Sequence, residues 1–156
     1  MNDYTAIINK LNAAIKNEQF QRVAATTVLA PYKKRIFSEG KDAQGQKIGT
    51  YGTKPISISK KNQARQTGKT YFSGGYAEYK NSIGKNPGFV NLRNTDQMMM
   101  DLGLIKNGAN FAFGFQNDVN GDKSEWMNTK YQKDIFNASQ SEIDLFSKTL
   151  SAQVFK

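Results

Sequence analysis

Few residues of this sequence have types and spacings that could do chemistry, and each pattern lacks a part that its chemistry requires. Gly68-Lys69-Thr70 matches the end of a phosphate-binding loop, but that motif needs a glycine at position 63, which is glutamine. Asp118-Val119-Asn120-Gly121-Asp122 has the oxygen-rich composition of a calcium loop. Its sixth and twelfth places are Lys123 and Thr129 instead of Gly and Glu. We interpret the first pattern as a basic loop and the second as a turn.

Carboxylates could in principle run acid–base chemistry, and paired carboxylates hydrolyse glycosidic bonds. Glu78, Asp96 and Asp101 are the ones nearest the aromatic and glycine-rich middle of the chain, but helix caps and surface ion pairs explain them as well. The chain has no histidine and no cysteine. It therefore lacks the commonest general base, the commonest transition-metal ligand and any thiolate. We expect neither an enzyme nor a cofactor or metal site.

One short stretch interleaves aromatic rings with lysines, a composition that can stack on bases and neutralise phosphates of single-stranded nucleic acid. Its members are Tyr71, Phe72, Tyr76, Tyr79, Lys69 and Lys80. No recognised nucleic-acid motif accompanies them, so half-buried rings that pack loops onto helices are the alternative reading. Met98-Met99-Met100 cannot all face inward, and we expect one of them at an interface, because Met adapts to irregular partners.

The net charge of +9 is concentrated in one segment. Residues 33–69 hold ten of the 22 Lys and Arg residues but only two acids, Glu39 and Asp42. Such an imbalance favours an acidic protein surface or nucleic acid as partner, whereas a mobile, solvated loop is the alternative. No apolar run reaches the ~20 residues of a membrane span. The N-terminal residues lack the pattern of a signal peptide. We expect a soluble protein made in a cytoplasm, with no membrane partner.

The hydrophobic periodicity predicts an α+β fold in one domain, residues 1–156. Helical spacing predicts two or three helical pieces within residues 3–39 and a break near Asn17. These helices pack on a small antiparallel sheet, and Gly40 ends them in a left-handed conformation. Residues 41–70 are predicted to form an extended basic loop or arm, in which residues 56–59 alternate like a short strand.

The second half of the chain carries the clearest strand signal. Asn107-Gly108 predicts a hairpin turn, after which Phe111, Phe113 and Phe115 line one sheet face. We expect these rings to pack on the N-terminal helices through Ile7, Ile8 and Leu11. Three further helices are predicted: a short one bearing Tyr76, Tyr79 and Ile83, a short one capped by Asp96 with Met99 and Leu102 inward, and one around Trp126, Met127 and Tyr131 after a polar loop at 117–122. Ser139 and Glu142 fit a capping box that starts a C-terminal helix.

Four segments together resemble the virion-morphogenesis and tail-completion proteins of tailed bacteriophages. They are Arg-Ile-Phe with Gly-Lys-Asp-Ala-Gln-Gly (35–45), Gly-Gly-Tyr-Ala-Glu-Tyr-Lys (74–80), Val-Asn-Leu-Arg-Asn-Thr-Asp-Gln-Met (90–98) and Asp-Ile-Phe-Asn-Ala-Ser-Gln-Ser-Glu-Ile (134–143). The resemblance covers roughly residues 20–150. The chain departs from the family where Asp96 replaces a usual Gly and where Asn137-Ala138 replaces a usual Gly-Leu.

The resemblance implies a structural virion protein, assembled in the host cytoplasm, that forms a homo-oligomeric ring at the head–tail neck or the tail end. Its partners would be neighbouring portal, neck or tail proteins, with the basic segment facing either packaged DNA or acidic protein. A small basic nucleic-acid-binding accessory protein is the alternative. The residues expected at interfaces are Lys33, Lys34, Arg35, Lys54, Lys60, Lys61, Arg65, Lys69, Tyr76, Tyr79 and Met98.

Overall fold

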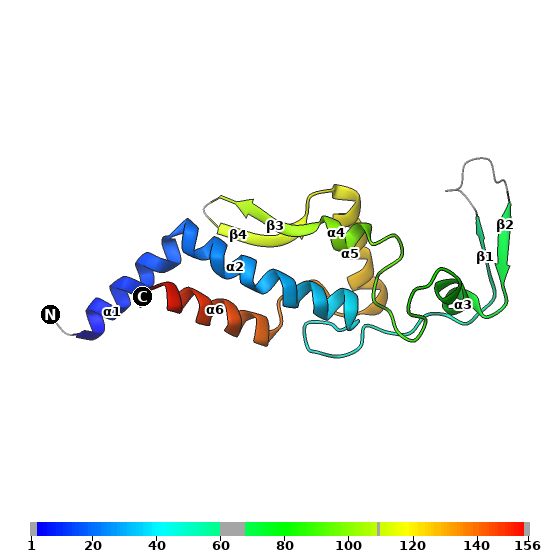
Figure 1. Cartoon of the computed structure of the whole chain (residues 1–156), viewed down its shortest axis with the longest axis horizontal. Helices are drawn as coiled ribbons and strands as arrows, with labels where there is room; N and C mark the ends of the chain where they lie inside the picture. Colours follow the sequence, from blue (N-terminus) through cyan, green and yellow to red (C-terminus); the bar gives the residue numbers. More distant parts are fainter. Residues whose placement is uncertain (1–2, 60–67, 109, 155–156) are drawn as a thin grey trace.

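The computed structural model describes residues 3–59, 68–108 and 110–154, and the molecule is elongated (Figure 1). Its helices are α1 (Asp3–Lys16), α2 (Glu18–Lys33), η1 (Lys34–Ser38), α3 (Gly75–Ser82), α4 (Gln97–Asp101), α5 (Asp118–Tyr131) and α6 (Gln140–Val154). Its strands are β1 (Ile56–Ser59), β2 (Lys69–Phe72), β3 (Leu102–Asn107) and β4 (Asn110–Phe115). The α+β class with N-terminal helices and a C-terminal helix is confirmed. None of the helices described combines the length and apolar character needed to cross a bilayer.

The molecule divides into two regions that we call the body and the arm. The body consists of α1, α2, η1 and α6, with the β3–β4 hairpin and α5 beside them (Figure 1). The arm consists of α3 and the β1–β2 hairpin, and it extends from the end of the molecule opposite α1 (Figure 1). The chain passes from body to arm near residue 50 and returns through residues 84–96.

The body is built on α2 and its continuation η1. The helix is interrupted at Asn17, between α1 and α2. Asn17 caps α2, because its side chain accepts the backbone N–H of Phe20 at 3.2 Å. Pro31 lies inside α2, and the wider π-helical turn of η1 follows it. This turn places three consecutive residues, 35–37, in the interior. Gly40 then has φ +62°, and a Cβ there would lie 2.4 Å from the Val90 carbonyl oxygen, so the position requires glycine.

The core gathers around these helical residues. Its buried members are Val28, Tyr32, Ile36, Phe37, Ile48, Val90, Met98, Leu102 and Ile135. Phe113 and Phe115 pack against this cluster from β4, and the Phe113 ring stacks on Tyr32 with ring centroids 4.7 Å apart. Burial of this apolar surface is the main stabilising contribution in a domain of this size.

The hairpin is confirmed, but its packing partner and its turn differ from the prediction. The Phe113 ring packs on Tyr32 of α2 and the Phe115 ring on Phe136, whereas Ile7 and Ile8 of α1 remain 42% and 55% exposed. The helix that carries them runs away from the sheet, so the prediction that they cover the hairpin is wrong (Figure 1). Asn107 pairs with Asn110, which moves the turn one residue later than the Asn-Gly pattern predicts.

The starts of α5 and α6 compare with the sequence predictions in opposite ways. The predicted polar loop at 117–122 is wrong, because α5 begins at Asp118 and Asn117 caps it by accepting the Val119 N–H at 2.9 Å. The predicted capping box of α6 is confirmed. Glu142 accepts the Ser139 N–H at 2.8 Å, and the Ser139 hydroxyl accepts the Glu142 N–H at 3.4 Å.

The segment predicted as one continuous loop, 41–70, contains three kinds of structure. Residues 41–48 form a tight turn in which buried Asp42 accepts two backbone N–H groups, and Ile48 enters the core. Residues 56–59 form β1, as their alternation predicts, and pair antiparallel with β2. Residues 60–67 lie outside the described part of the chain.

Candidate functional site

Arg35, predicted to contact a partner, is a structural residue of the body. Its guanidinium pairs with Glu142, with Nε–Oε1 at 2.8 Å and Nη2–Oε2 at 3.2 Å. It also donates to the carbonyls of Lys41, Ile135 and Asn137 at 2.8–3.1 Å. Arg35 is 8% exposed and Glu142 is 4% exposed. The charge of Arg35 is therefore neutralised inside the chain by an acid 107 positions away, and an interface role for Arg35 stays a prediction.

The remaining predicted cations do not form one patch in the part of the chain described. Lys34 lies on the body near Glu39, at 3.8 Å, and Lys33 beside it is half-buried. Lys54 and Lys69 are exposed on the arm. Lys60, Lys61 and Arg65 lie outside the described residues.

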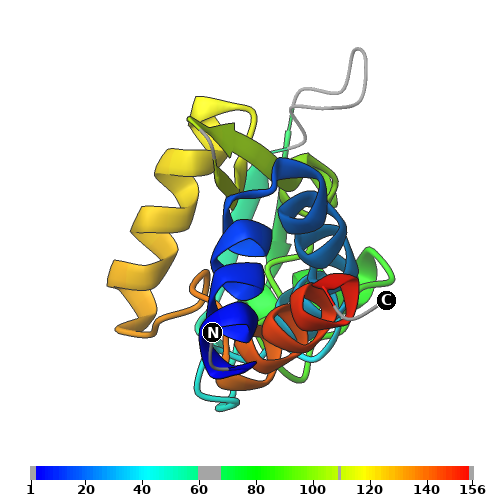
Figure 2. The ribbon, with the colours of Figure 1, turned by 90° about the vertical axis from the view of Figure 1, so that its left-hand side faces the viewer.

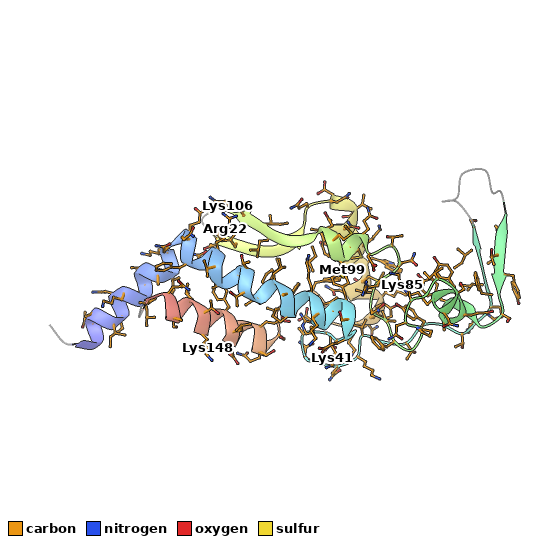
Figure 3. The ribbon with its side chains drawn as sticks, viewed as in Figure 1. Arg22, Lys41, Lys85, Met99, Lys106 and Lys148 are labelled. Carbon is orange, nitrogen blue, oxygen red and sulfur yellow. The ribbon has the colours of Figure 1, made fainter. Side chains whose placement is uncertain are left out.

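Other basic side chains are spread widely over the molecule. Figure 3 shows Arg22 and Lys106 on one long side of the molecule and Lys41 and Lys148 on the other, on three different elements and the loop after η1. Of the cations of residues 33–69 that the structure describes, Lys34 lies on the body, whereas Lys54 and Lys69 lie on the arm.

Tyr76 and Tyr79, also predicted at an interface, form an aromatic cluster at the base of the arm. Their ring centroids are 5.3 Å apart, Tyr76 lies 5.3 Å from Tyr51, and Tyr79 lies 5.5 Å from Phe72. Both tyrosines are half-buried. Burial raises the pKa of Tyr51 to about 12 and also raises the pKa of Tyr76. For Phe72, Tyr76 and Tyr79 this arrangement matches the alternative reading of half-buried packing rings, whereas Tyr71 is 65% exposed.

The three consecutive methionines have different environments. Met98 is 8% exposed and belongs to the core, whereas Met100 is 77% exposed, and an interface role for Met98 stays a prediction. Asp96 precedes α4, as predicted, but it makes no side-chain cap. Its carboxylate instead pairs with Lys85 at 2.7 Å and with Arg93 at 2.8 Å, and these bonds hold the pKa of Asp96 well below its usual range.

The face of α1 is a candidate surface that the predicted interface residues omit. An apolar stripe runs along this helix at positions 7, 8, 11, 14 and 15, about 100° wide. Ala14 is buried at one edge of the stripe, whereas Ile7, Ile8 and Ile15 are 42%, 55% and 53% exposed. Viewed from this end in Figure 2, α1 stands in front with α6 beside it. The rest of the chain therefore leaves part of this apolar stripe uncovered.

A cavity of about 740 Å³ lies between the base of the arm and α5. Sequence reasoning missed it, since its walls come from four separate segments. They are Thr50–Gly52, α3 with Tyr76 and Lys80, residues 90–98, and α5 with Lys123, Trp126, Lys130 and Tyr131. Lys80 is only 1% exposed, donates to the Arg93 carbonyl and lies 5.1 Å from the Tyr51 ring centre. Burial lowers the pKa of Lys80 to about 8.

The carboxylates considered for catalysis each have a structural contact. Glu78 accepts the Gly74 N–H at 2.7 Å, and Asp101 accepts the Asn117 N–H at 3.2 Å and the Asn120 side chain at 2.9 Å. Residues 3–59, 68–108 and 110–154 bring together no group of three metal-ligating side chains. Comparisons of the chain with protein-family models, curated proteins and solved structures found no match.

Proposed function

We propose that this protein is a structural subunit of a homo-oligomeric ring at the head–tail neck or tail end of a tailed bacteriophage. The observation that carries the proposal is the pair of dissimilar ends of the molecule. One end exposes the apolar face of α1, and the other extends as the arm (Figure 1). The sequence resemblance to virion-morphogenesis proteins, given by residues 35–45, 74–80, 90–98 and 134–143, supports the specific location in a particle.

Dissimilar ends favour a particular kind of assembly. An apolar surface on a soluble subunit is a typical protein–protein contact, and three half-exposed isoleucines on one helix make such a surface. If it contacts a different surface on the next copy, the contact is heterologous, and repeated heterologous contacts form a ring when the rotation between copies closes. An arm that reaches beyond its own body suits contact with a neighbouring subunit.

A small nucleic-acid-binding protein is the second candidate, because the net charge is +9. The distribution of that charge makes it the weaker one. Lys41 and Lys148 lie on the long side opposite Arg22 and Lys106 (Figure 3), whereas a DNA-binding surface gathers its cations on one face or groove. A measurement of DNA affinity against salt separates the two functions, since a DNA-binding protein shows a steep salt dependence.

The test compares two exposed apolar positions that differ in location. Ile8→Glu changes the α1 face, and Val119→Glu changes an equally exposed side chain on α5, at 55% and 58% exposure. We expect the purified protein to form a defined oligomer, Ile8→Glu to lower its mass by native mass spectrometry, and Val119→Glu to leave it unchanged. Circular dichroism confirms that both variants fold.

Location in the particle needs a separate measurement. Mass spectrometry of purified virions should detect the protein, and a particle reconstruction should place it in a ring at the neck or tail end. Its absence from particles would contradict the virion role. A monomer at all concentrations whose mass is unaffected by Ile8→Glu would contradict the ring.

A further inference from the structure

The cavity between the arm and α5 contains a buried cation without an acidic partner. Lys80 is 1% exposed, yet in the part of the chain that the structure describes no carboxylate lies within ion-pair distance of its ammonium. Its contacts are the Arg93 carbonyl and the faces of Tyr51 and Tyr76, at 5.1 and 6.0 Å. A buried ammonium with such neutral partners is destabilised, and burial accordingly lowers the pKa of Lys80 to about 8. An anion in the cavity would relieve this cost.

The rest of the lining is also cationic. Lys123 and Lys130 of α5 add two ammonium groups. The one carboxylate of the lining, Asp96, is already paired with Lys85 and Arg93. The cavity therefore carries an excess of positive charge that no described acid of the lining neutralises.

Aromatic rings form much of the wall. Trp126, Tyr131, Tyr51 and Tyr76 line the cavity, and the Lys130 ammonium lies 4.5 Å from the Trp126 ring centre. Aromatic surfaces of this kind bind flat or bulky apolar groups, and Tyr and Trp with cations are typical of the energetic centres of protein interfaces. A volume of about 740 Å³ accommodates a few side chains of a peptide.

We infer that this cavity binds a segment of a neighbouring polypeptide in which an acidic residue stands next to an aromatic residue. The carboxylate contacts Lys80, and the aromatic side chain packs against the wall formed by Trp126 and Tyr131. This inference rests on the proposed function, since it names the site through which the assembly subunit holds a neighbour.

The chemistry favours a carboxylate over a nucleic-acid phosphate. The cations of the lining are the ammonium groups of Lys80, Lys123 and Lys130. Phosphate sites commonly use arginine forks, and the guanidinium near this cavity, that of Arg93, already bonds Asp96 at 2.8 and 3.1 Å. A protein segment is therefore the occupant that fits the lining.

The single tryptophan of the chain lines the cavity, so its fluorescence reports binding without a label. We would titrate the full-length protein with the blocked peptide acetyl-Gly-Asp-Phe-Gly-amide and with analogues that replace Asp by Asn or Phe by Ala. We expect saturable binding of the first, and at least ~10-fold weaker binding of the Asn analogue, because a charge-assisted hydrogen bond is lost. The Ala analogue should also bind more weakly.

Variants locate the effect at Lys80. Lys80→Met should weaken binding of the Asp peptide by ~10-fold or more, while Lys148→Met, an exposed lysine on α6 away from the cavity (Figure 3), should leave it unchanged. If Lys80→Met fails to fold by circular dichroism, the comparison of Asp with Asn peptides on the unchanged protein still decides. Equal affinity for those peptides, or no saturable response, would overturn the inference.

A further arm of the titration uses adenosine monophosphate and a six-residue thymidine oligonucleotide. Tighter binding of either, with displacement of the peptide, would overturn the assignment to a protein segment. These titrations need only the purified chain. Their failure would leave the oligomer and virion tests of the proposed function unaffected.

Discussion

The body and the arm of this protein are held together in different ways. The body has a continuous apolar core, and a buried ion pair, Arg35–Glu142, that joins η1 at the end of α2 to α6. The arm has two strands of four residues each and is attached through rings at its base. Isolated two-stranded hairpins are marginal in water, so the arm depends on its junction for order. The difference indicates a body stabilised by its own core and an arm whose stability depends on its junction with the body.

The ion pair of the body gives the largest expected effect. Arg35→Ala leaves Glu142 buried without its partner and should lower the free energy of unfolding by about 3–5 kcal/mol in chemical denaturation. Lys106→Ala removes an exposed pair with Glu18, at 2.8 Å, and should cost no more than about 1 kcal/mol. Equal losses in the two variants would show that Arg35 does not hold the body together.

Packing of the hairpin on α2 comes next. Phe113→Ala removes a half-buried ring stacked on Tyr32 and should lower the free energy of unfolding by about 2–3 kcal/mol, less than a fully buried phenylalanine. Met100→Ala, at an exposed position in α4 just before β3, serves as the control and should change the free energy of unfolding little. An unchanged melting temperature for Phe113→Ala would contradict the observed packing.

A glycine at the junction tests whether the arm can open alone. Gly75 has φ +72°, and a Cβ there would lie 2.5 Å from the Lys54 carbonyl oxygen, whereas Gly84 has φ +68° and open space. Gly75→Ala should therefore lower the free energy of unfolding of the arm by about 1–3 kcal/mol, and Gly84→Ala should lower it by about 1 kcal/mol. Hydrogen exchange should speed up in α3 of the Gly75 variant but not in α2 and α6. Equal acceleration throughout would mean that arm and body unfold as one unit.

The smallest expected effect is a pH dependence of stability that arises at the junction of arm and body. Burial lowers the pKa of Lys80 to about 8 from 10.5, so between these values the unfolded chain binds more protons and stability rises with pH. The raised pKa values of Tyr51 and Tyr76 reverse the trend above pH 10, where the unfolded chain loses phenolic protons first. Denaturation between pH 7.5 and ~9.5 should show the rise, and Lys80→Met should remove it. If stability still rises with pH in Lys80→Met, another titratable group causes the rise.

Local structure followed from the sequence wherever a few neighbouring residues determine it. The capping box of Ser139 and Glu142, the alternation of β1 and β4, and the left-handed Gly40 were predicted, because hydrogen bonds, side-chain direction and backbone freedom act over short distances. The start of α5 was missed, since Asn and Asp favour turns as well as caps and the pattern does not distinguish them.

Only the tertiary structure decided which side chains meet. Arg35 and Glu142 are 107 residues apart in the sequence. They form a buried ion pair because α6 packs along α2, and this packing buries a cation that the sequence analysis placed at the surface. The burial of Met98, the exposure of Ile8 and the burial of Lys80 against Tyr51 and the Arg93 carbonyl likewise depend on how elements pack. Charge and hydrophobic periodicity limit the environments that each residue tolerates. The packing of the elements decides whether its side chain lies in solvent, in the core or at a contact with a partner.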